Sequence, residues 1–235
     1  MTLEEVMQQL EGMGSEQTKT VLMRHGAREP FFGVKVGDLK KIVKKVKKDQ
    51  ELAFELYATG NSDAMYLAGL ISEPKKMTKA QIQDWAEKAY WYMLSEYTLA
   101  WVAAESNHGW ELAKEWIASE NERLASCGWA TFSSVLAVTA DDQLNMKEVD
   151  ELLDYAEKNI HNSTNRVRYT MNGFIISAGC HVYPLFEKSK KVAAKIGKVQ
   201  VRMGGTSCKV PLALQYIEKV EKMNKVGNKR KTAFC

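Results

Sequence analysis

The sequence has few of the residues that several common architectures need. Only 4 prolines and 15 glycines occur in 235 residues, too few for the many turns of an all-β sandwich. The four cysteines are scattered and none forms a C-x-x-C pair, which excludes a disulfide scaffold and predicts free thiols in a reducing compartment. These cysteines are Cys127, Cys180, Cys208 and Cys235.

Long apolar runs are also missing. No window approaches the 18 or so uninterrupted apolar residues of a transmembrane helix. Met1 to Leu10 is acidic and polar, unlike a signal peptide. Together with the unpaired cysteines, this predicts a cytoplasmic protein without membrane contact.

Motifs for metals, nucleotides and nucleophilic catalysis are absent as well. The four histidines are far apart and no H-x-x-x-H occurs, so no metal site is expected. The sequence contains neither a Walker A loop nor a G-x-S-x-G turn. We therefore expect no cofactor.

What is present is an ordinary globular composition with unevenly placed charge. Hydrophobic residues make up 45% and charged residues 26%, with a net charge of +4. Residues 186–235 hold 13 basic and 3 acidic residues, whereas residues 49–162 hold 8 basic and 20 acidic residues. Such a segregation predicts a basic surface suited to an anionic polymer such as DNA.

A second basic block lies near the N-terminus. It consists of Lys35, Lys40, Lys41, Lys44, Lys45, Lys47 and Lys48. One reading is a DNA-binding surface, and the alternative is a solvated helix face. At the other end of the chain, residues 227–235 are expected to form a frayed basic tail.

Apolar residues repeat at helical period along most of the chain. Val36, Leu39, Ile42, Val43 and Val46 form one stripe, with lysines on the remaining faces. Similar patterns, often preceded by Ser or Thr as an N-cap, predict helices over Thr2–Gly12, Ser15–His25, Lys35–Lys48, Glu51–Ala58, Ser62–Ser72, Thr78–Tyr92, Ser95–Ala104, Asn107–Ala118, Glu120–Val138, Met146–Asn159, Ser163–Ala178, Tyr183–Ile196 and Thr206–Met223.

Many short helices with short connections indicate an all-α protein. Helix pairs recur roughly every 35–45 residues, which favours an α-α superhelix of HEAT-like antiparallel pairs over a simple bundle. No linker divides the chain, so residues 1–226 are expected to form one helical-repeat domain. Only Lys198–Met203 alternates in the manner of a short extended segment.

The chain resembles the HEAT-like alkylpurine DNA glycosylases, the AlkD-like DNA alkylation repair proteins. The resemblance covers most of the chain and rests on Phe32-Gly33-Val34-Lys35 before Leu39-Lys40-Lys41-Ile42, on Trp116 to Asn121, on Arg166 to Gly173, and on Gly197-Lys198-Val199 with Gly205 to Pro211. It implies a C-shaped stack of helix pairs whose basic concave face cradles duplex DNA. It also implies excision of an alkylated base without flipping it into a deep pocket.

The residues matched to the catalytic centre depart from the family pattern. In active members an Asp follows an aromatic residue by four positions and stabilises positive charge on the sugar. Here Tyr97 takes the aromatic position and Trp101 stands where the Asp is expected, while Ser126 replaces a backbone-contacting arginine. An indole cannot replace a carboxylate in this role. The nearest carboxylates are Glu96 and Glu105, and Glu105 could substitute only if the helix rotated.

Further residues could contact DNA. Tyr97 and Trp101 share a helix face and could stack on a sugar or an exposed base, or simply pack in the core. Arg166 and Arg168 stand at a polar helix start that suits a phosphate, or merely caps the helix. Thr206 and Lys209, with Ser207, follow a glycine turn at an expected helix start, where the same two readings apply.

Two functions are therefore open. The first is a DNA-binding repair-type protein that grips duplex DNA, including damaged or distorted duplex, with base excision by a DNA glycosylase activity left undecided. The second is a non-catalytic helical-repeat scaffold that binds a protein or peptide. A positive concave face would favour DNA, and a negative one would favour the scaffold.

Overall fold

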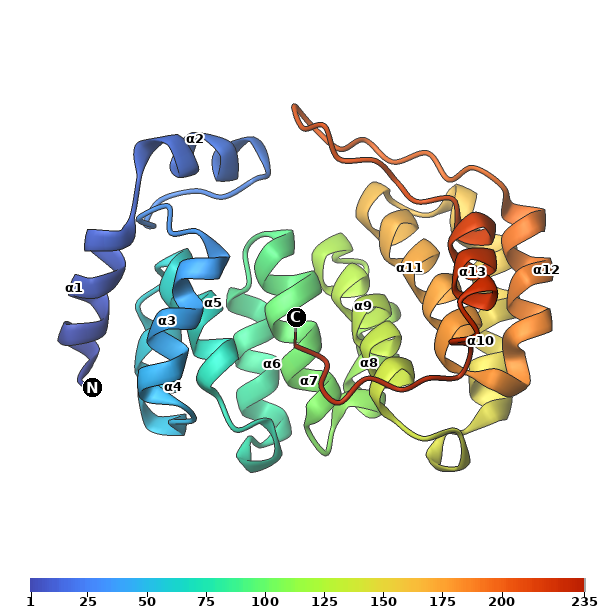
Figure 1. Cartoon of the computed structure of the whole chain (residues 1–235), viewed down its shortest axis with the longest axis horizontal. Helices are drawn as coiled ribbons and strands as arrows, with labels where there is room; N and C mark the ends of the chain where they lie inside the picture. The colour runs from blue at the N-terminus through green and yellow to red at the C-terminus, as the bar shows by residue number, and fades with distance from the viewer. Residues whose placement is uncertain (235) are drawn as a thin grey trace.

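The computed structural model describes residues 1–234 and shows a curved stack of helices (Figure 1). The α-helices are α1 (Leu3–Met13), α2 (Glu16–Arg24), α3 (Val36–Val46), α4 (Gln50–Ala58), α5 (Ser62–Ile71), α6 (Lys79–Lys88), α7 (Ala100–Glu105), α8 (Gly109–Ile117), α9 (Glu122–Val138), α10 (Met146–Asn159), α11 (Asn165–His181), α12 (Phe186–Ile196) and α13 (Ala213–Lys222). Residues 1–234 contain no β-strand. The all-α prediction is confirmed.

Side-chain caps begin several helices where the sequence predicts them. The Thr2 hydroxyl accepts from the Glu5 backbone N–H while Glu5 accepts from Thr2, and Thr78 forms the same reciprocal box with Gln81. Each box satisfies two backbone donors that the first helical turn leaves without partners. The helix predicted over Thr78–Tyr92 is shorter than expected, however, since α6 ends at Lys88.

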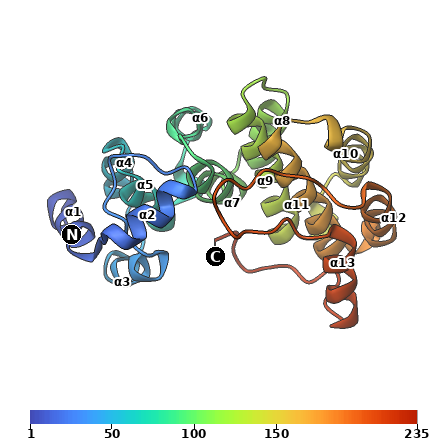
Figure 2. The ribbon, with the colours of Figure 1, turned by 90° about the horizontal axis from the view of Figure 1, so that it is seen from above.

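The helices form two rows. Seen from above, α4, α6, α8, α10 and α12 make an outer row, and α3, α5, α7, α9, α11 and α13 make an inner row (Figure 2). The inner row is concave, because α3 and α13 at its two ends lie farther from the outer row than α7 does in the middle (Figure 2). This is the α-α superhelix that the helix-pair spacing predicts.

Two apolar cores fill the space between the rows. One core joins α1 to α8 and includes Trp116, while the other joins α8 to α13 and includes Trp129. Helix α9 contributes Cys127 to the first core and Trp129 to the second. Trp116 and Trp129 are each 1% exposed.

A π-helical segment interrupts the inner row before α7. This segment, η2 (Met93–Leu99), replaces part of the regular α-helix expected over Ser95–Ala104. It packs against α5 at Gly69, where an added Cβ would lie 2.3 Å from Thr98 Cγ2. The missing side chain of Gly69 thus allows the wider π turn to approach α5. Short π segments occur often at functional sites.

The helix predicted over Thr206–Met223 is wrong in its first part, because α13 begins only at Ala213. Residues 197–212 instead form a long arm without regular secondary structure, in which the extended Lys198–Met203 pairs with no strand (Figure 1). Two features prevent a helix there. Gly204 has a φ of +66°, and Pro211 lacks an N–H and disfavours the α conformation of the residue before it.

The C-terminal tail differs from its predicted frayed state. Residues 227–234 run from α13 across the concave face to α7 (Figure 2). The Arg230 backbone N–H donates to the Ala137 carbonyl at 2.7 Å, and Ala233 is buried. The Phe234 ring centroid lies 5.9 Å from that of Trp101. The tail is therefore part of the folded inner surface.

Two further sequence expectations concern membranes and thiols. Within residues 1–234, no helix is both long and apolar enough to cross a bilayer. Cys127, Cys180 and Cys208 are free thiols, the first two buried. Cys235 lies outside the described residues.

Candidate nucleic-acid interface

A buried ion pair lies at the centre of the concave face. The Arg166 guanidinium, on α11, donates to both carboxylate oxygens of Glu96 in η2, with Nε to Oε1 at 2.8 Å. The Glu96 side chain is 2% exposed and the Arg166 side chain 17%. Two parallel charge-assisted hydrogen bonds fix both the distance and the relative orientation of η2 and α11.

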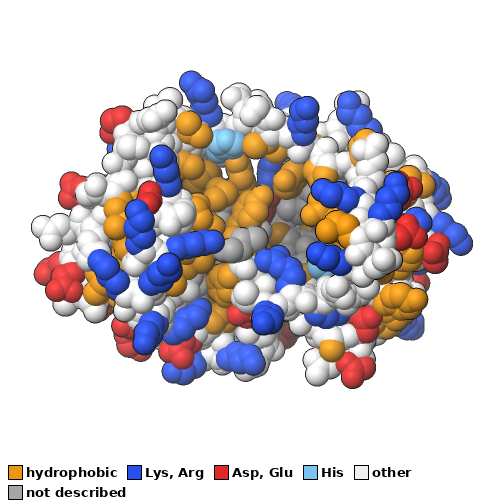
Figure 3. Space-filling view, viewed as in Figure 1, with side chains coloured by type: hydrophobic (Ala, Val, Ile, Leu, Met, Phe, Trp, Pro, Cys, Tyr) orange, Lys and Arg blue, Asp and Glu red, His pale blue; other side chains and the backbone are white. Residues whose placement is uncertain are grey.

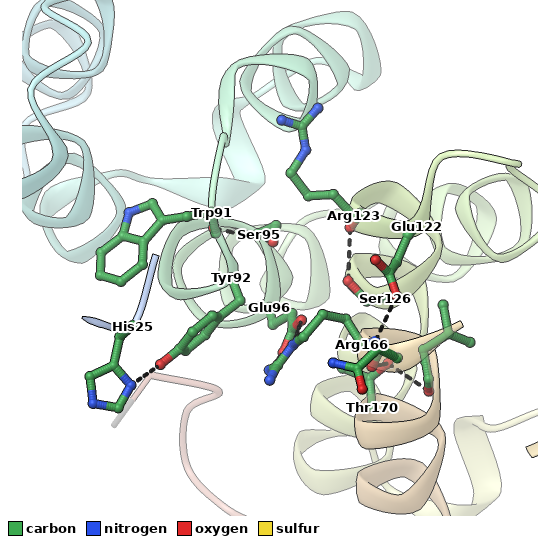
Figure 4. A network of polar contacts seen from close by, with 12 residues as sticks. His25, Trp91, Tyr92, Ser95, Glu96, Glu122, Arg123, Ser126, Arg166 and Thr170 are labelled. Carbon is green, nitrogen blue, oxygen red and sulfur yellow. Dashed lines mark hydrogen bonds and ion pairs between the residues drawn. The ribbon is translucent and has the colours of Figure 1, made fainter. Parts of the chain in front are cut away.

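Aromatic rings surround this ion pair. The Arg166 guanidinium carbon lies 4.4 Å from the Tyr92 ring centroid and 4.5 Å from that of Tyr169. The Tyr92 hydroxyl also hydrogen-bonds His25 Nδ1 at 2.5 Å (Figure 4). One connected network thus joins α2, η2 and α11, which come from both halves of the superhelix.

The electrostatics of the network follow from its burial. Removal from water raises the pKa of the Glu96 carboxyl, and the Arg166 hydrogen bonds oppose that rise. Burial also raises the pKa of Tyr92 to about 12 and raises that of Tyr97 further. Both phenols therefore stay neutral at physiological pH and act as aromatic and hydrogen-bonding groups.

A cavity of about 220 Å³ opens beside the ion pair. Helices η2, α7, α9 and α11 and the tail contribute its lining, which consists of Glu96, Tyr97, Trp101, Ala130, Ser133, Ser134, Tyr169, Thr170, Gly173 and Arg230. In the space-filling view of the concave face, hydrophobic side chains line a central hollow (Figure 3). In the same view, Lys and Arg side chains lie on both sides of the hollow, and Asp and Glu side chains lie mainly toward the margins (Figure 3).

Two of the three candidate catalytic residues line this cavity, and the third does not. Tyr97 and Trp101 line the cavity together, with ring centroids 5.7 Å apart, as their spacing predicts. Glu105 does not line it. Its carboxylate accepts hydrogen bonds from the Thr232 hydroxyl and, at 2.7 Å, from the Ala233 backbone N–H, so it anchors the tail. The carboxylate that reaches the cavity is Glu96.

Helix α3, which carries most of the lysine block, lies at one end of the concave inner row (Figure 2). Lys41 pairs with Asp38 at 2.7 Å, and Lys45 donates to Gln9 Oε1 at 3.3 Å. The predicted DNA-binding lysines Lys35, Lys40, Lys41, Lys44 and Lys45 are all exposed on or just before α3. Their role in DNA binding stays a prediction.

The two arginines of α11 lie in its first turn, as predicted, but both are already engaged. Arg166 pairs with Glu96, and its backbone N–H donates to Glu122 Oε1 at 2.8 Å. Arg168 Nε donates to the Ser163 carbonyl at 2.7 Å, and its Nη1 donates to the Gln200 carbonyl. A carboxylate thus occupies this helix start, and Arg168 secures the arm to α11.

Thr206 and Lys209 are in the arm and not at a helix start. The Thr206 hydroxyl donates to the Met203 carbonyl at 2.8 Å, and Lys209 is exposed. The helix-dipole argument for a phosphate site at these residues is therefore wrong, because α13 begins only at Ala213. Any contact with DNA would come from their exposed positions along the arm.

Sequence reasoning missed the roles of Glu96, Tyr92, Tyr169 and His25. The π turn brings Tyr92 and Tyr97, five residues apart, to a ring distance of 6.4 Å, which a period of 3.6 does not suggest. The Glu96–Arg166 pair joins residues 70 positions apart. Residues 1–234 also hold no cluster of three His, Cys, Asp or Glu suited to a metal ion.

Comparisons with known proteins show which family the chain resembles. A family model described as DNA alkylation repair enzyme matches residues 6–188. An uncharacterized protein of Listeria innocua is 37% identical over 225 residues, covering 93% of this chain and 97% of that protein. An uncharacterized protein of Listeria monocytogenes is 36% identical over 231 residues, covering 96% of this chain and 100% of that protein.

A solved structure matches over 100% of both chains, with a TM-score of 0.91 and 39% identity. It is described as a new family of proteins related to the HEAT-like repeat DNA glycosylases with affinity for branched DNA structures. The family match covers most of the chain, and the fold similarity extends over all of it. The chain therefore belongs to the DNA alkylation repair enzyme family.

Proposed function

We propose that this protein binds branched or otherwise distorted DNA on its concave face and does not excise bases there. The observation that carries the proposal is the arrangement of that face, in which Lys and Arg side chains flank a central aromatic-lined hollow (Figure 3). Basic flanks bind phosphates without regard to sequence, and a central cavity selects shape. The affinity for branched DNA ascribed to the structural neighbour supports the same reading.

The position of the acidic residues also favours DNA over a basic protein partner. Much of the acidic middle of the sequence lies on outer-row helices, where Glu111 and Glu115 of α8 pair with Lys79 of α6. In α10, Asp150 and Asp154 pair with Lys188 of α12. The acidic charge thus faces away from the concave side, contrary to what the scaffold hypothesis needs.

The absence of excision follows from two side chains. Trp101 carries no charge to stabilise a developing oxocarbenium ion. Glu96 carries one, but Arg166 holds both of its oxygens and neutralises it. We infer that the cavity binds DNA without cleaving the glycosidic bond.

Fluorescence anisotropy with four-way junctions, three-way junctions and linear duplex of equal length, over a range of salt concentrations, tests the proposal. We expect tighter binding to the junctions and a steep loss of affinity with salt. Base release from alkylated duplex should not exceed that of DNA alone. Equal affinity for junction and duplex, or no binding at low salt, would contradict the proposal, and protein-dependent base release would contradict its second part.

A further inference from the structure

Gly173 has a position that helix packing does not explain. It lies inside the 17-residue helix α11, where glycine costs about 0.5–1 kcal/mol relative to alanine. A Cβ added there would meet no heavy atom within 4 Å. By contrast, a Cβ at Gly179 in the same helix would lie 2.6 Å from Ile217. Packing requires Gly179, whereas the missing side chain of Gly173 leaves the cavity beside it open.

The walls of this cavity are suited to a planar ring. Tyr97, Trp101 and Tyr169 line it. Neighbouring side chains fix the orientations of Trp101 and Tyr169. Tyr66 and Phe234 pack edgewise on Trp101 with ring centroids 6.1 and 5.9 Å away, and Arg166 lies against the ring of Tyr169. Aromatic side chains held in this way offer faces on which a base can stack without further ordering.

Three aliphatic hydroxyl groups of the cavity present hydrogen-bond acceptors. The hydroxyls of Ser133 and Ser134 donate to the carbonyls of Trp129 and Ala130, at 2.9 and 3.0 Å. The Thr170 hydroxyl donates to carbonyls of its own helix at 3.2 Å. With each hydroxyl proton directed to the backbone, the oxygen lone pairs remain for a donor in the cavity.

We propose that this cavity receives one unpaired nucleobase that carries an exocyclic amino group, as adenine and cytosine do. The proposal rests on the binding of branched DNA proposed above, because branch points supply unpaired bases. The volume of about 220 Å³ admits a single base.

The test uses the full chain and three-way junctions that differ only at the branch point. One junction is fully paired, and the others carry a single unpaired adenine, an unpaired thymine or an abasic site. For the wild type we expect the unpaired adenine to improve affinity on the order of 10-fold over the paired junction. Thymine and the abasic site should give little of this gain.

The variant Gly173→Leu fills the cavity, and we expect it to lose the preference for unpaired adenine. Gly12→Leu is the matched control, because Gly12 also lies in a helix, is exposed, and has no atom within 4 Å of its added Cβ. It should keep the preference. Circular dichroism melting establishes whether Gly173→Leu remains folded.

A second measurement needs no variant. With 2-aminopurine at the unpaired position, stacking on Tyr97, Trp101 or Tyr169 should quench its fluorescence on binding. A wild type that binds all junctions equally, a folded Gly173→Leu protein that keeps the preference, or an abasic junction that binds as well as adenine would overturn the inference. Failure of the wild type to bind even the paired junction would instead refute the proposed function.

Discussion

The centre and the flank of the concave face are built in opposite ways. At the centre, the buried Glu96 pairs with Arg166, and the partly buried Tyr92 and Tyr169 pack against the guanidinium, so that these side chains hold one another in fixed positions. On the flank, the α3 lysines are exposed and only lightly constrained, as in the Lys41–Asp38 pair on the helix surface. A rigid centre can select a shape, whereas a flexible charged flank supplies affinity that depends on salt.

The two regions should therefore respond differently to substitution. Changes at the centre should alter the stability of the fold and the choice of DNA structure. Changes on the flank should alter affinity and its salt dependence while leaving the fold unchanged.

The largest effect is expected from breaking the central ion pair. Glu96→Ala leaves Arg166 buried without its partner, which should lower the free energy of unfolding by roughly 3–5 kcal/mol. Glu96→Gln keeps a hydrogen-bonding group and should lower it less. Chemical denaturation measures both values.

Asp84→Ala is the matched control for the ion pair. Asp84 pairs with Lys88 on the surface of α6, with about half of each side chain exposed. Its loss should change stability by no more than about 0.5 kcal/mol. Similar losses for the Glu96 and Asp84 variants would mean that the centre is no more rigid than the surface.

The next effect concerns the flank. Replacing Lys41, Lys44 and Lys45 together with glutamine should weaken junction binding roughly 10-fold and reduce the salt slope by about 2–3. The free energy of unfolding should stay within about 0.5 kcal/mol of the wild type. Anisotropy titrations at several salt concentrations measure the slope.

Lysines of the outer row provide the control for the flank. Lys88, Lys147 and Lys158 lie on α6 and α10 and are exposed. Replacing these three with glutamine removes the same charge from the opposite side of the molecule. If this variant loses as much affinity as the α3 variant, the concave flank is not the DNA-binding surface.

The fold was predictable because its signals are local. The apolar stripe from Val36 to Val46 specifies α3, and the capping residues Thr2 and Thr78 mark helix starts. The predicted start of α13 at Thr206 was wrong, because Gly204 and Pro211 interrupt an otherwise helix-like pattern.

The candidate site was only partly predictable because it depends on tertiary contacts. The i, i+4 spacing of Tyr97 and Trp101 correctly placed their rings together. The pairing of Glu96 with Arg166, and the use of Glu105 to hold the tail, depend on how distant helices pack. No periodicity in one segment reports such contacts.

A third prediction concerns the tail, which touches both regions. The Phe234 ring packs on Trp101 of the centre. Lys48 Nζ lies 5.0 Å from the centroid of the Phe234 ring. Phe234→Ala should lower the free energy of unfolding by about 1–2 kcal/mol, since it removes an aromatic pair and a cation–π contact. Thermal melting measures the loss. Lys231→Ala, at an exposed tail position, should have little effect, and equal losses would show that Phe234 does not secure the tail.

The smallest effect is a pH dependence of the tail anchorage. His181 Nδ1 hydrogen-bonds the Asn228 carbonyl at 2.7 Å, and burial lowers the pKa of His181 below its ordinary 6.5, with Lys229 and Arg230 adding to that shift. The unfolded chain therefore binds the proton more readily. This contribution to stability is complete above pH 6.5 and is lost as the pH falls toward the lowered pKa.

The melting temperature should therefore be lower at pH 5.5 than at pH 7.5. The difference should be smaller for His181→Asn than for the wild type. Removing residues 229–235 eliminates the two neighbouring cations and should also reduce the difference. If wild type and His181→Asn show the same change, the histidine does not sense pH. The anchorage of the tail between the centre and the flank would then not depend on the protonation of His181.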